Sequence, residues 1–502
     1  MKLNPIKVIL FLLLCAYASV SLRAQETFIK RYKNTSLSEA GIAVANLPDN
    51  KIAVIGQQSN GFIWQSPMVI ITDSTGKQLR HFVDTSCFAC DVYDGTTDTS
   101  GYIYVVGKFF NKAGIAKYDT SGNKIWQKEL STNGGEAAYL SVSTTKKGDL
   151  ILAGGFQIHY PEVVGWALIA AYTLTGDTVW VIDSQLGYTW PETGVGVLTL
   201  ATDSNMVYAT GVVYDTLPIR SYFLRVRLDG SNVYNTELNN GRKMGYGIVP
   251  LSPDSILIGG WGTTFFSDQY KYLSIVDSMG NVLATIEDTT MTLQSLEKMV
   301  YDYSSNKLYL LDGDTIQIGN SFDFFPHISV FDYPIQDINQ PIWEKTIYGT
   351  DVSSTRGLAL ANDGTILHCG YASNNYCPYL LKADENTCAD LACDTSFVSG
   401  LFLPDEENTP KVNLTLKLFP NPVVGEYLYF ELHSDQPIKS VSTSCTDVAG
   451  KVVTLVPEGE FIGKEFYRGR IAIPAGLPRG MYIFRVSADQ KYVLKGKFTK
   501  AD

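Results

Sequence analysis

Most of the chain repeats one pattern of apolar and polar positions, with a period of about fifty residues. The clearest copy is SGYIYVVGKFFNKAGIAKYDTSGNKIWQK at residues 100–128. It contains an apolar run that ends in Gly, a second run that ends in Asp-x-x-Gly, and a third short run that contains Trp. Short runs rich in β-branched and aromatic residues, separated by turn residues, are typical of antiparallel strands. Each copy therefore predicts one four-stranded sheet.

The pattern occurs seven times. Four further copies lie at residues 50–79, 147–180, 204–233 and 254–283, the first of them weaker than the others. The two most divergent copies are NKLYLLDG with HISVFDYP and DGTILHCG with YLLKADEN. A four-stranded sheet repeated around an axis forms a β-propeller. We therefore expect an all-β chain with a seven-bladed propeller over residues 25–394.

Two residue types have a mechanical role in this pattern. The Asp of Asp-x-x-Gly can accept hydrogen bonds within its own turn, and the Gly can adopt a positive φ. We expect the Trp residues of the last run to pack between neighbouring blades; they are Trp126, Trp180 and Trp343.

The seventh copy has no fourth run, because the chain after Lys382 enters a segment that contains cysteines. At residues 27–44, TFIKRYKNTSLSEAGIAV matches the end of one copy and the start of the next, as in residues 124–142. A propeller must cover the edge of its last sheet. The sequence therefore predicts that Thr27–Lys33 forms the outermost strand of the seventh blade.

The pattern changes after Cys393. Residues 395–412 contain Pro and a run of acidic residues, which is typical of a linker. Residues 413–502 contain about seven short alternating runs, which predict a small β-sandwich. The characteristic segments of this region are, in order, LFPNP, YLYFEL, TDVAGKVV, LPRGMYIFRV and KGKFTK.

These segments, in this order, resemble the type A sorting domain of the bacterial type IX secretion system. The resemblance implies an immunoglobulin-like sandwich that the secretion machinery reads and its sortase removes. It assigns the sorting motif to Pro420, Asn421, Pro422, Gly450, Gly480, Tyr482, Lys495 and Lys497. The alternative is a generic adhesive module. Residues 26–385 resemble a family of secreted bacterial propeller-repeat proteins, which implies a fold and little chemistry.

The N-terminal residues predict export. Lys2 and Lys7 precede an apolar run and small residues that end at Ala24, which is the layout of a signal peptide over residues 1–24. The run is shorter than the about 20 residues of a membrane span, so we expect no transmembrane anchor. The net charge of −11, without a Lys or Arg cluster, argues against nucleic-acid binding. We expect a protein that passes through the periplasm and is secreted or held on the outer cell surface.

The cysteines predict disulfides. Cys87 and Cys90 form one expected bridge, and four more cysteines could supply two others whose pairing is left open: Cys369, Cys377, Cys388 and Cys393. The histidines are too isolated to predict a zinc site, so we expect no metal and no cofactor.

No familiar catalytic motif occurs, and we assign no catalytic residue. Aromatic residues lie in the loops between the second and third strands, and before the fourth blade, on one expected face. They are Trp64, Phe110, Tyr160, Trp190, Tyr214, Trp261, Phe266, Phe325 and Tyr371. Acidic residues at the start of innermost strands, such as Glu39, either cap turns or hold a cation. The sequence predicts a protein that binds a glycan or peptide; a polysaccharide hydrolase or lyase and a structural or adhesive surface component are the alternatives.

Overall fold

The structure is a computed structural model, and Met1–Leu401 and Phe402–Asp502 form two compact units that we describe separately. It describes residues 27–32, 37–59, 65–87, 89–130, 135–159, 164–184, 194–214, 220–238, 241–263, 269–288, 295–318, 321–347, 352–372, 377–385, 397–398, 414–423, 426–435, 437, 440–447, 452–453, 457–461, 466–474, 477–488 and 492–501. Among these residues, no helix is both long and apolar enough to span a bilayer. The expected signal peptide and most of the expected linker lie outside them.

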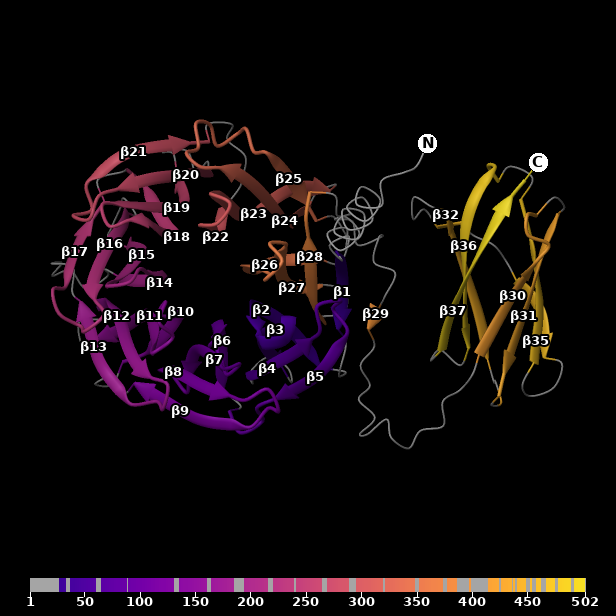
Figure 1. Ribbon diagram of the computed structural model, residues 1–502, viewed down its shortest axis with the longest axis horizontal. Helices are drawn as coiled ribbons and strands as arrows, with labels where there is room; N and C mark the ends of the chain where they lie inside the picture. The colour runs from indigo at the N-terminus through magenta and orange to yellow at the C-terminus, as the bar shows by residue number, and fades with distance from the viewer. Residues whose placement is uncertain are drawn as a thin grey trace, which may run out of the picture. The chain divides into compact units, whose positions relative to one another are not determined.

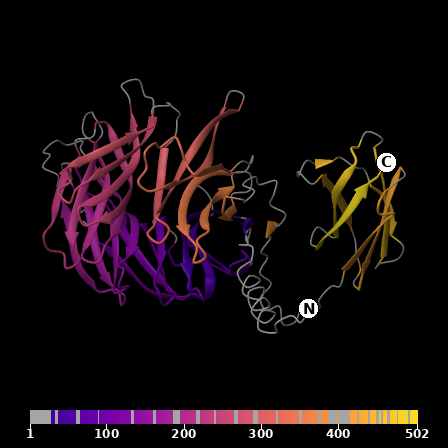
Figure 2. The same cartoon turned by 45° about the horizontal axis from the view of Figure 1, so that its top comes forward.

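The N-terminal unit is a seven-bladed β-propeller. Its seven antiparallel sheets lie around one axis, and each sheet has its first strand nearest that axis (Figures 1 and 2). The first blade contains β2 (Ser38–Leu47), β3 (Lys51–Ser59), β4 (Gln65–Thr72) and β5 (Gln78–Val83). The second contains β6 (Cys90–Thr97), β7 (Ile103–Phe109), β8 (Lys112–Tyr118) and β9 (Lys124–Leu130). The third contains β10 (Ala137–Thr144), β11 (Leu150–His159), β12 (Val164–Thr173) and β13 (Thr178–Ser184). A short 3-10 helix, η1 (Pro48–Asn50), joins β2 to β3.

The next three blades follow the same order. They contain β14 (Gly194–Thr202), β15 (Met206–Tyr214), β16 (Arg220–Arg227) and β17 (Tyr234–Glu237); β18 (Lys243–Ser252), β19 (Ser255–Thr263), β20 (Gln269–Val276) and β21 (Val282–Glu287); and β22 (Ser295–Asp302), β23 (Lys307–Ile318), β24 (Ser321–Asp332) and β25 (Trp343–Thr346).

The seventh blade combines strands from both ends of the propeller. Its inner strands are β26 (Val352–Leu360), β27 (Ile366–Ala372) and β28 (Cys377–Ala383). β1 (Phe28–Tyr32) then pairs antiparallel with β28, and β29 (Phe397–Val398) pairs parallel with β1. β1 thus occupies the position that the sequence predicts for Thr27–Lys33.

The turns between third and fourth strands have the expected chemistry. In the fifth blade, Asp277 Oδ1 accepts hydrogen bonds from the backbone N–H groups of Met279 and Asn281, and Gly280 has a φ of 74°. The side-chain amide of Asn281, followed by these backbone groups, lowers the pKa of Asp277, although burial opposes the shift. The Asp therefore holds the turn, and Gly supplies the left-handed backbone.

The Trp residues pack between blades, as the sequence predicts. Trp126 Nε1 donates to Leu174 O of the third blade at 3.1 Å, and Trp180 Nε1 donates to Leu228 O of the fourth at 2.9 Å. Trp343 packs against the core shared by the sixth and seventh blades. Large rings at the outer seams thus bury apolar area and satisfy backbone carbonyls of the next blade.

The C-terminal unit contains two antiparallel four-stranded sheets over one core. One sheet has the order β30 (Leu414–Phe419), β31 (Tyr427–Ser434), β35 (Phe466–Ala472), β34 (Pro457–Phe461). The other has the order β33 (Val452–Val453), β32 (Val441–Asp447), β36 (Gly480–Ala488), β37 (Tyr492–Lys500). Phe430 of the first sheet meets Phe484 of the second, with ring centroids 5.2 Å apart.

Within this unit, Asn421 joins the LFPNP segment to the last strand. Its Nδ2 donates to Lys497 O at 2.9 Å, and its Oδ1 accepts from Thr499 N at 3.0 Å. Val423 extends the contact, because its N–H donates to Thr499 O at 2.8 Å. Two segments at opposite ends of this unit therefore form one hydrogen-bonded structure.

Most of the other expected motif residues also lie among the described residues. Tyr482 is buried, donates to Pro478 O and stacks on Phe498. Gly480 begins β36 with a φ of 154°, Lys495 lies in β37, and Gly450 is outside the described residues. Pro422 follows Asn421 and is exposed.

Candidate functional site

Every innermost strand of the propeller contains a β-bulge. Its register with the second strand shifts by one residue, which leaves an extra residue in the inner strand. The extra residues are Ile42, Tyr93, Leu140, Leu198, Tyr246, Glu297 and Arg356. Bulges re-aim side chains and occur often beside functional sites. These seven positions therefore mark the ring around the central axis as the place to look for a site.

In six blades a Gly of the second strand lies opposite the residue that precedes the bulge, and in the sixth blade Asp312 takes this place. A Cβ at Gly107 would collide with Asp91 O, and a Cβ at Gly56 would collide with Ala40 O. The inner strand approaches the second strand so closely there that only Gly fits. The Gly that ends the apolar run was a signal for the bulges of six blades, and the sequence-based prediction did not use it.

A cavity of about 390 Å³ lies at the bulges of the first two blades. Tyr93 and Ile42, the two bulge residues, lie in its wall together with Tyr371 of the seventh blade. The remaining lining residues are Ser38, Glu39, Ala40, Gly41, Gln57, Ser59, Gln65, Asp91 and Val92. The cavity therefore combines two tyrosine rings with carboxylate, amide and hydroxyl groups.

Hydrogen bonds and ion pairs hold the polar side chains of this wall. Gln57 Oε1 accepts from the backbone N–H of Val92 at 3.1 Å, which ties the first blade to the bulge of the second. The buried carboxylate of Glu39 accepts from Gln58 Nε2 at 2.8 Å. On the other side, Lys108 Nζ lies 4.0 Å from Asp91 Oδ2. The wall is thus positioned by contacts between and within blades.

An ion pair joins opposite sides of the ring next to this cavity. Lys298 Nζ of β22 in the sixth blade lies 3.3 Å from Asp94 Oδ1 of β6 in the second. Asp94 Oδ2 also accepts from the backbone N–H of Val142 in the third blade at 3.0 Å. Asp94 follows the bulge residue Tyr93 directly, so this pair lies beside the cavity wall and connects three blades.

The structure places few of the predicted aromatic residues at this cavity. Trp64, Tyr160, Trp190 and Phe266 lie outside the described residues, and Tyr214 is described only as the last residue of β15. Phe110 is exposed in the turn between β7 and β8, and Trp261 stacks on the bulge residue Tyr246 with centroids 6.4 Å apart. Of those among the nine that the structure describes, Tyr371 alone lines the cavity.

Phe325 corrects one expectation. It lies inside the twelve-residue strand β24 opposite Asp314, and only 5% of its surface is exposed. The segment from Ser321 to Phe325 alternates aromatic and polar residues and continues the pairing with β23, so the hairpin extends where the sequence-based prediction placed a loop. Tyr93 and Gln57, which do line the cavity, were not among the predicted site residues.

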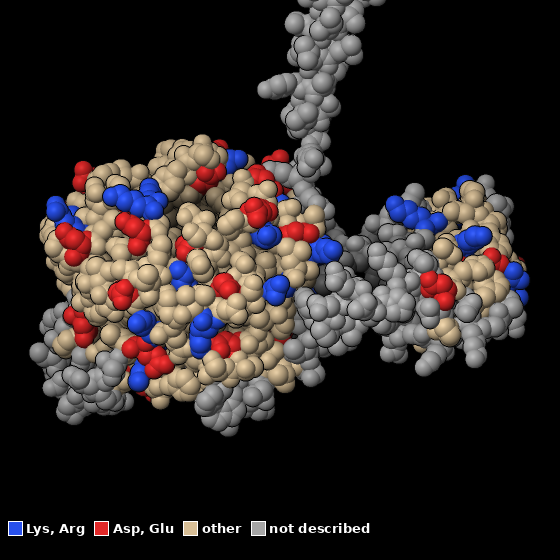
Figure 3. Space-filling model, turned by 60° about the horizontal axis from the view of Figure 1, so that its bottom comes forward, with Lys and Arg blue, Asp and Glu red and all other residues tan. Residues whose placement is uncertain are grey.

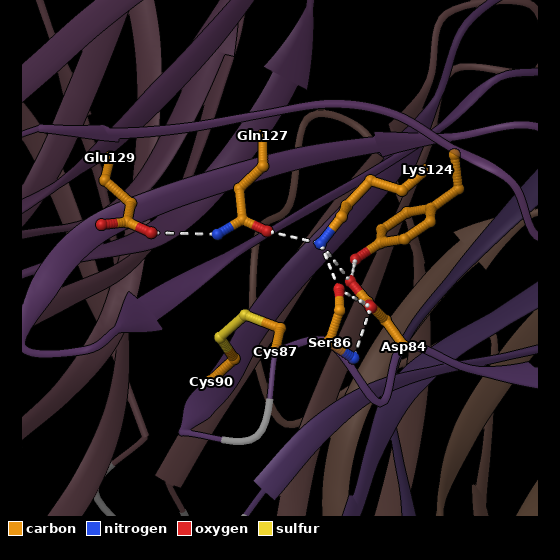
Figure 4. A network of polar contacts seen from close by, with 8 residues as sticks. Asp84, Ser86, Cys87, Cys90, Lys124, Gln127 and Glu129 are labelled. Atoms are coloured by element: carbon orange, nitrogen blue, oxygen red, sulfur yellow. Dashed lines mark hydrogen bonds and ion pairs between the residues drawn. A yellow bond between two sulfur atoms is a disulfide. The ribbon is translucent and has the colours of Figure 1, made fainter.

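A second polar cluster surrounds the disulfide between Cys87 and Cys90, whose Cα atoms lie 5.6 Å apart (Figure 4). Asp84 accepts hydrogen bonds from Tyr118, at 2.7 Å, and from Ser86, and lies 3.0 Å from Lys124 Nζ. Although burial opposes it, these contacts hold the pKa of Asp84 below its usual value. The cluster fastens the link between the first two blades.

Cys369 is a buried thiol and not part of a disulfide. It lies in the apolar core between the seventh and first blades, and burial raises its pKa to about 12. Cys377 lies opposite Ala372 at the far end of β27, and Cys388 and Cys393 are outside the described residues. Cys369 and Cys377 therefore form no disulfide among the described cysteines, and the bridges that the sequence left open stay a prediction.

The surface charges are mixed. Figure 3 shows acidic and basic side chains interspersed over the visible face of the propeller. Among the residues that the structure describes, no group of three or more His, Cys, Asp or Glu side chains could hold a metal ion.

No protein-family model matches this chain, and no curated protein matches it. It is similar in structure to the β-propeller domain of the Trilobed protease from Pyrococcus furiosus, at 8% identity, with 70% of this chain and 98% of that one covered and a TM-score of 0.41. It is also similar to the acylaminoacyl peptidase of Pyrococcus horikoshii, at 11% identity, over 78% of this chain and 58% of that one, with a TM-score of 0.41. A third similar structure is Drosophila Plexin A in complex with Semaphorin 1b, at 9% identity, over 72% of this chain and 87% of that one, with a TM-score of 0.36.

Proposed function

We propose that this chain is an exported binding protein whose propeller holds a glycan in the cavity beside Tyr93 and Tyr371. The observation that carries the proposal is one cavity of about 390 Å³ that three blades line together. The first and second blades contribute their bulged inner strands, and the seventh contributes Tyr371. That volume falls in the usual range of small-molecule sites. A site built from three blades at the axis of a rigid ring is well suited to hold a ligand in one orientation.

The lining favours a saccharide. Sugar rings have apolar faces that pack on aromatic rings and hydroxyl edges that need hydrogen-bond partners. Tyr93 and Tyr371 supply the rings, and Gln57, Glu39 and Asp91 supply amide and carboxylate groups. Side-chain contacts already fix Gln57 and Glu39, so little conformational entropy is lost when a ligand binds. A short peptide is the competing ligand.

A glycan array probed with the full chain tests the proposal. Tyr93→Ala and Tyr371→Ala should each weaken binding to the selected glycan at least about tenfold, which corresponds to about 1.4 kcal/mol. Phe110→Ala is the matched control, because Phe110 is an exposed aromatic residue of the same blade as Tyr93 outside the cavity. Binding that is insensitive to both Tyr variants, or binding of peptides alone, would reject the assignment.

Hydrolysis is the second candidate function, because two carboxylates, Glu39 and Asp91, line the same cavity. Paired carboxylates are the groups that glycoside hydrolysis requires. Glu39→Gln keeps the shape of the side chain and removes its charge. If the array ligand is cleaved by the wild-type chain and only bound by Glu39→Gln, the protein is an enzyme; if neither chain cleaves it, binding is the whole activity.

We also propose that the C-terminal unit is a sorting domain of the type IX secretion system. The ordered motifs support this, as does the bond between Asn421 and the last strand, because it makes the LFPNP and KGKFTK segments one structure. Deleting residues 413–502 should leave a folded propeller in the periplasm, since the two units have separate cores. Cell fractionation measures this, and normal export of the truncated chain would make the unit an adhesive module.

A further inference from the structure

The outward face of one sheet in the C-terminal unit exposes large aromatic rings. Along β31, Leu428, Phe430 and Leu432 point into the core, and the alternating residues Tyr427, Tyr429 and Glu431 take the other face. Phe419 of β30 pairs with Tyr429, and the two residues are 39% and 37% exposed. Exposed neighbouring rings of this size are uncommon on a protein surface and mark binding sites.

The two rings form a flat surface. Phe419 and Tyr429 have centroids 5.9 Å apart and planes that differ by only 14°. Arg470 lies opposite Tyr429 on β35, and its guanidinium lies over the Tyr427 ring, 5.0 Å from the centroid. Pairing across three strands therefore holds the aromatic rings in place.

Polar groups border the rings. Arg468 donates to Glu431 Oε1 from Nε, at 3.1 Å, and from Nη2, at 2.6 Å, while 53% of the Arg468 side chain stays exposed. The row Lys417, Glu431, Arg468 alternates in charge across the strands. The surface thus offers both hydrogen-bond donors and acceptors beside the rings. An open cavity of about 550 Å³ lies over Phe419, Pro420, Tyr429, Glu431 and Arg468.

We propose that this surface, formed by Phe419, Tyr429, Glu431 and Arg468, binds a neutral polysaccharide chain. Sugar rings stack on Phe419 and Tyr429, and their hydroxyls pair with the Glu431 carboxylate and the Arg468 guanidinium. The flat, open shape suits a chain that continues beyond the site, and Arg468 is already paired with the Glu431 carboxylate, which repels an acidic chain at the rings. This site lies wholly within the C-terminal unit and does not depend on the propeller cavity.

Affinity electrophoresis of the full chain tests this site. The gels contain a soluble β-glucan, a xylan, a mannan or, as the charged comparison, a polygalacturonate. At least one neutral polymer should retard the protein, and Tyr429→Ala and Phe419→Ala should each weaken that binding at least about tenfold. Tyr429→Phe should retain it, because stacking needs the ring and not the hydroxyl. Tyr303→Ala is the control, since Tyr303 is an exposed ring that packs on another ring, Tyr301, but belongs to the propeller and lies outside both cavities.

The outcomes separate this proposal from the others. Retardation by no neutral polymer, or by polygalacturonate alone, overturns it. Equal loss in Tyr429→Phe and Tyr429→Ala overturns the stacking contact. Loss with Tyr93→Ala and not with Tyr429→Ala places the polysaccharide site in the propeller, which rejects this site and supports the propeller cavity. A secretion defect in Tyr429→Ala without any polysaccharide binding shows that the surface contacts a protein, which also rejects the proposal.

Discussion

The second and seventh blades have the same arrangement of four antiparallel strands but different chain connections. All four strands of the second blade, β6 to β9, follow one another in the sequence. The seventh blade takes β26 to β28 from one end of the propeller and β1 from the other. No chain connection joins β1 to β28, so hydrogen bonds and packing alone hold β1 in the seventh blade. In the second blade the polypeptide chain also connects the third strand to the fourth.

The contact at the outer seam is nevertheless the same in both. In the second blade, Trp126 packs against Gly176 in the turn of the third. In the seventh blade, Phe28 packs against Gly76 in the turn of the first. At the closing seam Tyr32 Oη donates to Gly76 O at 2.8 Å, and in the second blade Trp126 Nε1 donates to Leu174 O at 3.1 Å. The comparison teaches that the ring closes with the same kinds of contact that its repeats already use.

Deleting residues 27–33 should have the largest effect. It removes the buried side chains of Ile29 and Tyr32 and exposes the edge of β28. Losing a large core side chain costs about 2–5 kcal/mol, so losing two removes most of the about 5–15 kcal/mol that stabilises a typical domain. We expect aggregation or a large fall in Tm, measured by circular dichroism. Adding the synthetic peptide TFIKRYK should restore part of the Tm, whereas an unchanged Tm of the deletion variant would exclude β1 from the ring.

The turn glycines test whether the two seams are equivalent. Gly76 and Gly176 have φ values of 74° and 89°, so Ala costs about 1–2 kcal/mol at either from the left-handed backbone alone. Overpacking adds about 1–3 kcal/mol where a Cβ meets a ring. The Cβ would be 2.9 Å from Trp126 and closer still to Phe28. We expect Gly76→Ala to lower the free energy of unfolding more than Gly176→Ala in urea titrations.

Gly148→Ala is the control for this pair. Gly148 has a φ of 67°, but the atom nearest to an added Cβ is Thr99 Oγ1 at 3.7 Å, so only the backbone cost applies. If the free energy of unfolding falls equally in all three variants, the aromatic rings do not constrain the turns. The contact between a ring and the turn glycine of the next blade is then not a common stabilising feature of the two seams.

Much of the fold could be predicted from the sequence because it depends on local chemistry. The alternating runs, the Asp277 turn and the inter-blade position of Trp126 follow from residue types at fixed offsets. The bulges of six blades could have been predicted from the Gly at the end of the second-strand run, such as Gly107, since an isolated Gly in a strand often marks a close backbone approach. The bulge of the sixth blade, opposite Asp312, has no such signal.

The candidate site could not be predicted in the same way. Tyr93 and Tyr371 meet only because the ring closes, and the sequence pattern does not measure how far each side chain reaches toward the axis. The Asp94–Lys298 pair joins residues 204 positions apart in nonadjacent blades, which no repeat offset encodes. Phe325 was misplaced because its hairpin runs longer than those of the other blades.

Acidification should distinguish the seventh blade from the second. His368 is fully buried, shares hydrogen bonds with Gly357 O and Tyr379 Oη, and burial lowers its pKa to about 4. The unfolded chain takes up a proton near pH 6.5 and the folded chain does not until about pH 4. Stability is therefore complete above pH 6.5 and falls between these values by about 3 kcal/mol.

The second blade has Val105 at the position of His368, two residues before the same glycine. The double variant His368→Val with Tyr379→Phe makes this position of the seventh blade apolar and leaves no hydroxyl without its partner. Between pH 6.5 and 4, the free energy of unfolding should therefore fall by about 3 kcal/mol less in this variant than in the wild type. Parallel stability curves for the two proteins would show that His368 is not the group that titrates.

The smallest expected effect is that of the hydrogen bond from Tyr32 at the closing seam. Tyr32→Phe keeps the buried ring and removes the donor to Gly76 O, which should cost about 0.5–1.5 kcal/mol in the free energy of unfolding. Trp126→Phe removes the corresponding donor of the second blade, but Leu174 O still accepts from Lys117 Nζ at 2.9 Å, so its cost comes mainly from lost packing. In a background with Gly76→Ala, which already disturbs the closing turn, Tyr32→Phe should cost measurably less, whereas Trp126→Phe should cost the same as in the wild type. Additive losses for Tyr32→Phe would mean that its hydroxyl does not help to hold this turn, and the closing seam would then rest on the same apolar contact as the others.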